Sequence, residues 1–138
     1  MIQRFTATTL FVNDQDEAKD FYVNKLGFEV RMDQSMGDFR WLTVSPKAQL
    51  DFQIILMKLA GHGHMSAENA ATLRDLIHKG VSAAGIFETA DIHKTYEELK
   101  ARGVEFVSPP EKKFYGWEAV FKDPTGNTFS LGERKPGA

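Results

Sequence analysis

The sequence offers histidines and paired carboxylates for chemistry, but it contains no cysteine. His62 and His64 are separated by a single glycine, a spacing that can provide half of a metal site. No acidic or histidine partner adjoins them, so we interpret this segment as a surface loop. Asp14 and Glu17 are the nearest match to the paired carboxylates of acid–base catalysis, yet both are explained as the cap of a helix. Asp91 is explained in the same way.

The other candidate groups have structural explanations. His78 lies near a predicted helix C-terminus, where a partly charged imidazole is favourable, and His93 lies exposed in the first turn of another helix. Without cysteine, disulfides, thiolate catalysis and cysteine-ligated zinc are excluded. Gly126 belongs to a turn with no helix after it, so it does not form a phosphate-binding loop. We assign no catalytic residue.

The composition is that of an ordinary globular domain. The chain has 138 residues, of which 42% are hydrophobic, enough for one domain with a real core. Its 17 basic and 19 acidic residues are interspersed, without the basic stripe that nucleic-acid binding needs. No apolar run approaches the ~20 residues that span a membrane, and the N-terminus lacks the apolar core of a signal peptide. We expect a cytoplasmic protein with no nucleic-acid or membrane partner.

A sequence pattern that occurs twice predicts the elements on which the candidate residues lie. Residues 14–30 read DQDEAKDFYVNKLGFEV, and residues 91–107 read DIHKTYEELKARGVEFV. Each copy has an Asp that caps a helix, about three helical turns, a Gly that ends the helix and an alternating apolar run. A strand-like run precedes each copy, at Phe5–Val12 (extending back to residue 3) and Ala84–Thr89. The chain therefore consists of two similar modules, and the functional site is expected where they meet.

The remaining elements give each module the order βαβββ. A helix between the modules is capped by Ser66 and ended by Gly80, with Ala70, Leu73 and Ile77 as its apolar stripe. We predict a single domain, with module one at about 1–60, the connecting helix at about 61–80 and module two at about 81–134. The other predicted strands are Phe28–Met32, Phe39–Val44, Phe52–Lys58, Glu105–Ser108, Tyr115–Lys122 and Asn127–Leu131, with turns at Met36–Asp38, Ser45–Lys47, Pro109-Pro110 and Asp123–Asn127.

Four segments carry a family resemblance. They are LFVND at 10–14, FYVNKLGF at 21–28, DIHKTYEELKARGVEF at 91–106 and WEAVFKDPTGNTFSL at 117–131. In this order they resemble the vicinal oxygen chelate superfamily, which includes glyoxalase I, bleomycin-resistance proteins, fosfomycin-resistance enzymes and extradiol dioxygenases. The resemblance implies an α+β fold in which two βαβββ modules form an open, cupped mixed sheet around a cleft, and it implies a homodimer. Whether the modules pair within one chain or swap between two chains stays open.

The resemblance also implies positions for a divalent metal. Carried over by spacing, the two usual histidines fall on Ala7 and Ala84 (Ala83 if the count shifts by one), the usual glutamate falls on Ser130, and Gln53 is the best match to a fourth ligand. A methyl group has no lone pair, and a site for zinc, nickel, manganese or iron needs about three donors. We therefore predict no metal or other cofactor, and we refer to Ala7, Ala84 and Ser130 as the former metal positions.

A cleft without metal is expected to bind a small organic molecule through aromatic walls and a few polar groups. We predict a metal-independent binding protein of the glyoxalase/bleomycin-resistance type that holds an aromatic or amphipathic ligand. One alternative is a metal-dependent glyoxalase-like lyase or isomerase, or a dioxygenase, with ligands such as His62, His64 and Gln53. Another is an interaction or regulatory module that docks through the helix at 66–79. The predicted ligand-binding residues are Trp41, Phe52, Gln53, Tyr115, Trp117 and Ser130.

Overall fold

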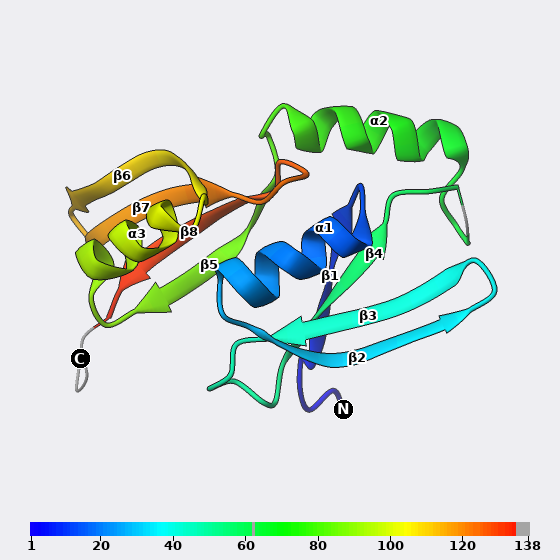
Figure 1. The fold of residues 1–138 in the computed structure, drawn as a ribbon, viewed down its shortest axis with the longest axis horizontal. Helices are drawn as coiled ribbons and strands as arrows, with labels where there is room; N and C mark the ends of the chain where they lie inside the picture. Colours follow the sequence, from blue (N-terminus) through cyan, green and yellow to red (C-terminus); the bar gives the residue numbers. More distant parts are fainter. Residues whose placement is uncertain (62, 135–138) are drawn as a thin grey trace. The chain divides into compact units, whose positions relative to one another are not determined.

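The computed structural model describes residues 1–61 and 63–134, and the chain divides into two compact units, residues 1–74 and 75–138. Each unit contains one four-stranded mixed sheet, and the elements follow the order βαβββ in both (Figure 1). The division falls inside helix α2, Ala67–His78, which lies between the two repeats in the sequence. The fold is therefore α+β with two βαβββ modules and open sheets, as predicted.

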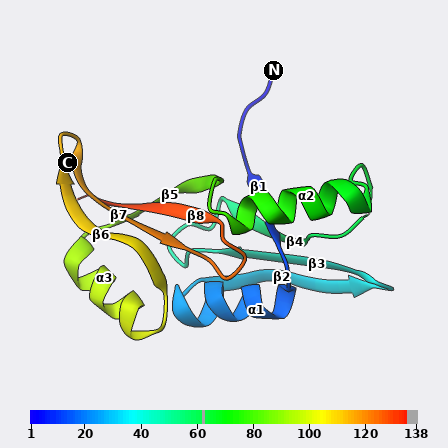
Figure 2. The same ribbon diagram turned by 90° about the horizontal axis from the view of Figure 1, so that it is seen from above.

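The first unit has the strand order β1-β4-β3-β2. Strands β1 and β4 are parallel, and the other pairs are antiparallel. Figures 1 and 2 show α1 along one face of this sheet, where Leu42, Val44 and Leu56 are completely buried. Its elements are β1 Ala7–Val12, α1 Gln15–Lys19, the π-helical segment η1 Asp20–Lys25, β2 Glu29–Met36, β3 Phe39–Ser45 and β4 Gln53–Lys58.

Local sequence signals account for the first helix. Asp14 caps α1, because its Oδ1 accepts the amide of Glu17 at 2.9 Å. The helical turns continue through η1 to Lys25 and are followed by Gly27, whose φ of 79° is the left-handed conformation that glycine adopts without strain. Both features were predicted. The π-helical turn was not predicted; there the amide of Leu26 donates to the carbonyl of Phe21, five residues earlier, at 3.0 Å.

The second unit repeats the topology, with the strand order β5-β8-β7-β6 and a parallel β5–β8 pair. Helix α3 covers one face of this sheet (Figures 1 and 2), over a core in which Phe87 stacks on Phe129 at 4.7 Å. Asp91 caps α3 by accepting the amide of Lys94 at 3.1 Å, as predicted. The elements are β5 Ala83–Thr89, α3 Ile92–Ala101, β6 Glu105–Lys113, β7 Gly116–Lys122 and β8 Thr128–Glu133.

Helix α2 has the cap and the end that were predicted. The hydroxyl of Ser66 accepts the amide of Asn69 at 3.0 Å, and Gly80 has a φ of 77°. Ala70 and Ile77 are buried, and Leu73 between them is half-buried. None of the helices in the described ranges has the length and apolar character that crossing a lipid bilayer requires.

Several predicted boundaries were wrong. The prolines Pro109 and Pro110 lie inside β6 instead of forming a turn, and the pairing of β6 with β7 shifts register between Ser108 and Glu111. An edge strand tolerates prolines because their missing amides face away from the ladder or fall in a bulge. Strand β1 begins at Ala7 and not at residue 3 or Phe5, and the strand expected to end at Met32 continues to Met36 as β2.

Candidate functional site

The former metal positions lie on the sheet faces that the helices leave uncovered. Side chains alternate between the faces of a strand, so Ala7 in β1 lies opposite the face that buries Leu10 and Val12. Ala7 is the register partner of Gln53 in the parallel β1–β4 ladder. The amide oxygen of Gln53 accepts a hydrogen bond from Thr43 Oγ1 at 2.8 Å, and Thr43 is only 1% exposed. In the first unit, this face therefore carries a methyl group beside an amide that already has a partner.

In the second unit, the corresponding face contains a polar group that the sequence analysis missed. Ser130 in β8 pairs with Ile86 in β5 and with Val120 in β7. Its hydroxyl donates to Glu118 Oε2 at 2.6 Å. Ala84 lies where the β5–β8 pairing shifts register, and it is half-buried. The side chain of Glu118 therefore lies next to the former metal position Ser130.

Tyr115 completes this group, because its hydroxyl donates to Glu118 Oε1 at 2.7 Å. We refer to Tyr115, Glu118 and Ser130 as the Glu118 cluster. The hydrogen bonds from Ser130 and Tyr115 lower the pKa of the Glu118 carboxyl below its ordinary value. The same contact raises the pKa of the Tyr115 hydroxyl, because ionised Tyr115 would lose its donor and face the carboxylate. The carboxylate form of Glu118 is therefore the stable one at neutral pH.

The alternation of side chains between the two faces of β7 could have identified Glu118 from the sequence. In the sequence WEAVF, Ala119 and Phe121 are buried on the helix-covered face. Glu118 and Val120 must then lie on the other face. What the alternation does not provide is the register of β8, which brings Ser130 to the same carboxylate.

The two predicted tryptophans are placed differently. Trp117 shares the face of Ala119, and its ring centroid lies 4.6 Å from that of His93 in α3. It therefore faces away from Glu118 and Ser130. Trp41 in β3 is half-buried and, by alternation, shares the face of Thr43 and Gln53.

The remaining predicted site residues are half-buried or exposed. Phe52 lies just before β4 and its ring contacts that of Phe5 at a centroid distance of 5.6 Å. Tyr115 is 57% exposed and packs edge to face on Phe114, with 4.9 Å between the centroids. The structure thus brings Tyr115 and Ser130 together on Glu118. Trp41 and Gln53 share a sheet face but lie at separate positions of the β3–β4 ladder, in which Thr43 pairs with Ile55. Their role in ligand binding stays a prediction.

The donors at the former metal positions do not fit a divalent cation. Ala7 and Ala84 offer only methyl groups, the Gln53 oxygen accepts from Thr43, and the Ser130 hydroxyl donates to a carboxylate. Zinc and related metals need about three oxygen, nitrogen or sulfur ligands from side chains. The side chains at these positions do not supply that number.

A different set of side chains has the composition of a metal site. One ligand atom each from Asp91, His93 and Glu133 lies within 4.8 Å of the others. Both carboxylates also serve the start of α3, where Asp91 accepts the amide of Lys94 at 3.1 Å and Glu133 accepts that of Ile92 at 3.0 Å. Helix capping explains these acids without an ion.

The predicted roles of the histidines can be checked in part. His93 is exposed in the first turn of α3, as predicted, although its ring also packs against Trp117. His78 is the last residue of α2, as predicted. His62 lies outside the described residues. The prediction that it belongs to a loop, and the alternative that it forms a metal site with His64, therefore stay untested.

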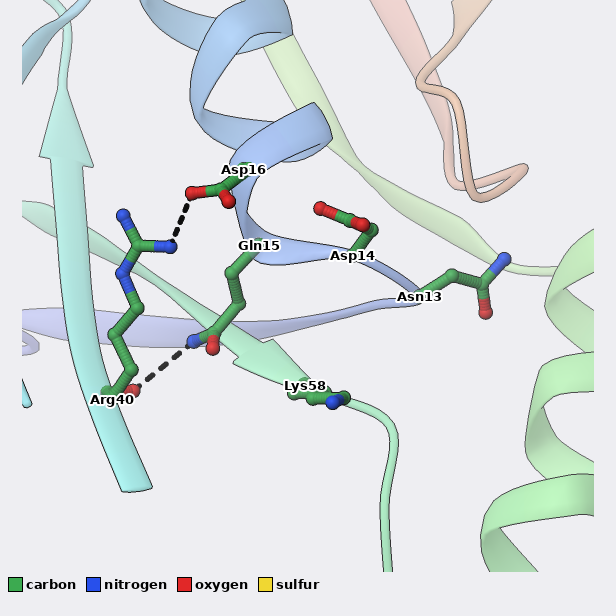
Figure 3. Close-up of a pocket in the computed structure, with 6 residues that line it drawn as sticks. All are labelled: Asn13, Asp14, Gln15, Asp16, Arg40 and Lys58. Carbon is green, nitrogen blue, oxygen red and sulfur yellow. Dashed lines mark hydrogen bonds and ion pairs between the residues drawn. The ribbon is translucent and has the colours of Figure 1, made fainter. Parts of the chain in front are cut away.

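A polar hollow of about 210 Å³ lies at the start of α1 (Figure 3). Arg40 lines one side of it and pairs with Asp16 at 2.7 Å, while Gln15 donates to the Arg40 carbonyl at 3.1 Å. Arg40 also bonds both oxygens of Asp33, which raises the arginine pKa and lowers the Asp33 pKa. These contacts tie α1 to β2 and β3. The residues lining the hollow are Asn13, Asp14, Gln15, Asp16, Arg40 and Lys58.

The family model for the Glyoxalase/Bleomycin resistance protein/Dioxygenase superfamily matches residues 4–131. Among solved structures, that of UcmS2 is 46% identical, with a TM-score of 0.91, and the match covers 97% of this chain and 100% of that one. TnmS3, described as an antibiotic binding protein from Streptomyces sp. CB03234, is 29% identical, with a TM-score of 0.75 and coverage of 97% and 98%.

The curated relatives include YurT of Bacillus subtilis (strain 168). It is 37% identical over 129 residues, which cover 93% of this chain and 97% of YurT. The likeness extends over nearly the full length of both proteins.

Proposed function

Because the chain belongs to the Glyoxalase/Bleomycin resistance protein/Dioxygenase superfamily, we propose that it binds a small organic molecule without a metal ion. The observation that carries this proposal is the chemistry of the former metal positions. Two of them, Ala7 and Ala84, have no donor atom, and the hydroxyl of Ser130 is engaged by Glu118. A lyase or dioxygenase of the metal-dependent kind would lack the ligands for its ion.

The uncovered sheet faces support a role in binding. Trp41 is half-buried, and Tyr115 is more than half exposed. Aromatic surface with a few oriented polar groups is typical of small-molecule sites. The likeness to TnmS3, described as an antibiotic binding protein, supports the same class of function. We propose an aromatic or amphipathic ligand that is held and not transformed. The working form that we expect is a cytoplasmic homodimer, which light scattering after gel filtration tests.

The decisive experiment combines metal analysis with ligand capture. The protein is purified from its own host without chelator, and native mass spectrometry records any organic molecule that remains bound. Elemental analysis then measures nickel, zinc, manganese and iron before and after treatment with EDTA. We expect substoichiometric metal and an organic ligand whose retention is unchanged by EDTA.

A control variant separates the two places where a metal could bind. His93→Ala removes the imidazole of the Asp91–His93–Glu133 group and leaves the former metal positions intact. Metal that disappears in His93→Ala belongs to that surface group and leaves the proposal standing. Stoichiometric metal that survives the substitution, together with ligand binding or turnover that EDTA abolishes, would overturn the proposal.

A further inference from the structure

The carboxylate of Glu118 lies close to aliphatic side chains on its sheet face, and its register partner in β6 is a second acid, Glu111. By alternation Glu118 shares a face with Val120 in β7, and its diagonal neighbour Ser130 pairs with both Val120 and Ile86. Ile86 is 80% exposed although it is aliphatic, and Val120 is half-buried. A ligand lying on this face would contact aliphatic side chains and reach the carboxylate at the same time.

The two hydrogen bonds of the cluster orient this carboxylate and leave it able to accept more. Tyr115 donates to Oε1 at 2.7 Å, and Ser130 donates to Oε2 at 2.6 Å. A carboxylate oxygen has two lone-pair sites, so each oxygen can accept a second donor. The hydroxyls of Tyr115 and Ser130 fix the plane of the Glu118 carboxylate. A ligand that binds it therefore has a smaller loss of side-chain entropy to overcome.

No cation of the described residues forms an ion pair with Glu118. The cation whose charge acts on Glu118 is Lys113, in the β6–β7 hairpin, and its Nζ pairs with Glu111 at 2.9 Å. Lys113 is the weakest of the influences on the Glu118 carboxyl, after the two hydrogen bonds and desolvation. The two hydrogen bonds already stabilise the charged form of Glu118. A cationic group from outside the protein would add an ion pair to that stabilised carboxylate.

An aromatic surface lies beside the carboxylate. Tyr115, which donates to Glu118, packs edge to face on Phe114 with 4.9 Å between the ring centroids. Phe114 is fully exposed, and it belongs with Tyr115 to the turn between β6 and β7. Exposed aromatic rings of this kind bind both flat ligands and cations.

We propose that the Glu118 cluster selects ligands that carry a protonated nitrogen next to an aromatic or aliphatic body. The inference rests on the proposed binding function and specifies its ligand class. The N–H groups of an ammonium or amidinium donate to the outer lone pairs of Glu118, while the ligand body lies on Ile86 and Val120 or against Tyr115. Tyr115 and Ser130 act by positioning the carboxylate.

The test uses two matched probes, naphthylmethylammonium and its neutral counterpart naphthylmethanol, and measures their dissociation constants by calorimetry at neutral pH. Charge-assisted hydrogen bonds to an oriented carboxylate give the ammonium at least about tenfold tighter binding. Glu118→Gln keeps the shape of the side chain and should reduce the affinity for the ammonium to that for the alcohol. Glu97→Gln makes the same change of charge in α3, on the far face of the sheet, and should leave the preference intact.

A measurement on the unaltered protein makes the test independent of variant folding. The preference for the ammonium should decrease as salt is added, because mobile ions screen the exposed part of the charge pair. Equal binding of both probes, or a preference that Glu118→Gln leaves unchanged, would refute the role of the cluster and leave the proposed function in place. If neither probe binds and no organic molecule is retained in the mass-spectrometric experiment, the proposed function fails together with this inference.

Discussion

Replacing Asp123 by alanine should destabilise the second unit more than any other single loss of a carboxylate. Asp123 is 3% exposed in the turn before β8. Its Oδ1 accepts the amides of Thr125, Gly126 and Asn127 at 3.0, 3.0 and 2.9 Å, and its Oδ2 accepts the Asn127 side-chain amide at 2.9 Å. One side chain therefore satisfies a whole turn of buried donors.

The magnitude can be worked out from these contacts. A hydrogen bond to a charged acceptor contributes about 1.5–3 kcal/mol, and a buried donor left without a partner costs about 1–3 kcal/mol. Water that enters the turn of the variant will satisfy some of the donors, so the sum of the separate values is an upper limit. We expect Asp123→Ala to lower the free energy of unfolding by at least ~3 kcal/mol, a large share of the ~5–15 kcal/mol of a typical domain.

The assay is urea unfolding followed by tryptophan fluorescence. Trp117 lies in the same unit as Asp123, and replacing Trp41 by phenylalanine makes the emission specific for that unit. The matched control is Glu97→Ala, because Glu97 is an exposed carboxylate in α3 of the same unit, and its loss should change stability by less than ~0.5 kcal/mol. A cost below ~1 kcal/mol for Asp123→Ala, or one equal to that of the control, would refute the hydrogen-bond argument.

Two further predictions concern stability. Gly126→Ala should cost ~2 kcal/mol or more in the same urea assay, because a Cβ at this φ of 114° would lie 2.5 Å from the carbonyl oxygen of Ile77. The control Gly116→Ala should cost clearly less, because Gly116 has a similar φ of 124° but open space around it. Equal costs for the two substitutions would contradict the steric argument. Asp33→Asn should cost ~1 kcal/mol at neutral pH through its contacts with Arg40. Because the folded-state pKa of Asp33 is lowered, its ion pairs stabilise the fold above the unfolded pKa of about 4, and this stabilisation is lost as the pH falls. The difference in free energy of unfolding between Asp33→Asn and the unaltered protein should therefore shrink in acid. A difference that stays constant with pH would count against the ion pairs.

Most of the fold could be predicted because its signals are local. A capping Asp, a helical apolar stripe and a Gly in the left-handed conformation are each set by a few neighbouring residues, as Asp91 and Gly103 show around α3. The predicted turn at Pro109-Pro110 failed for the opposite reason. Prolines usually mark turns, but here they lie in an edge strand, and only the pairing of β6 with β7 shows that their missing amides are tolerated.

The candidate site was only partly predictable. Ser130 was found because the family spacing points to it, whereas Glu118 was missed because no family ligand occupies its position. Trp117 matches Trp41 in sequence but is placed on the helix-covered face beside His93. The face on which a side chain lies is fixed by strand register and not by residue type, and a shift of one residue reverses it.

The amino-acid sequence by itself determined the repeated βαβββ order, the helix caps and the lack of donor atoms at Ala7 and Ala84, since each depends on residue identity or on neighbours within a few positions. Only the tertiary structure decided that Ser130 and Tyr115 meet on the two oxygens of one carboxylate. That meeting depends on the pairing of β7 with β8 and on the hairpin before β7. Hydrogen bonds between strands set this geometry, and they join residues that are far apart in the chain.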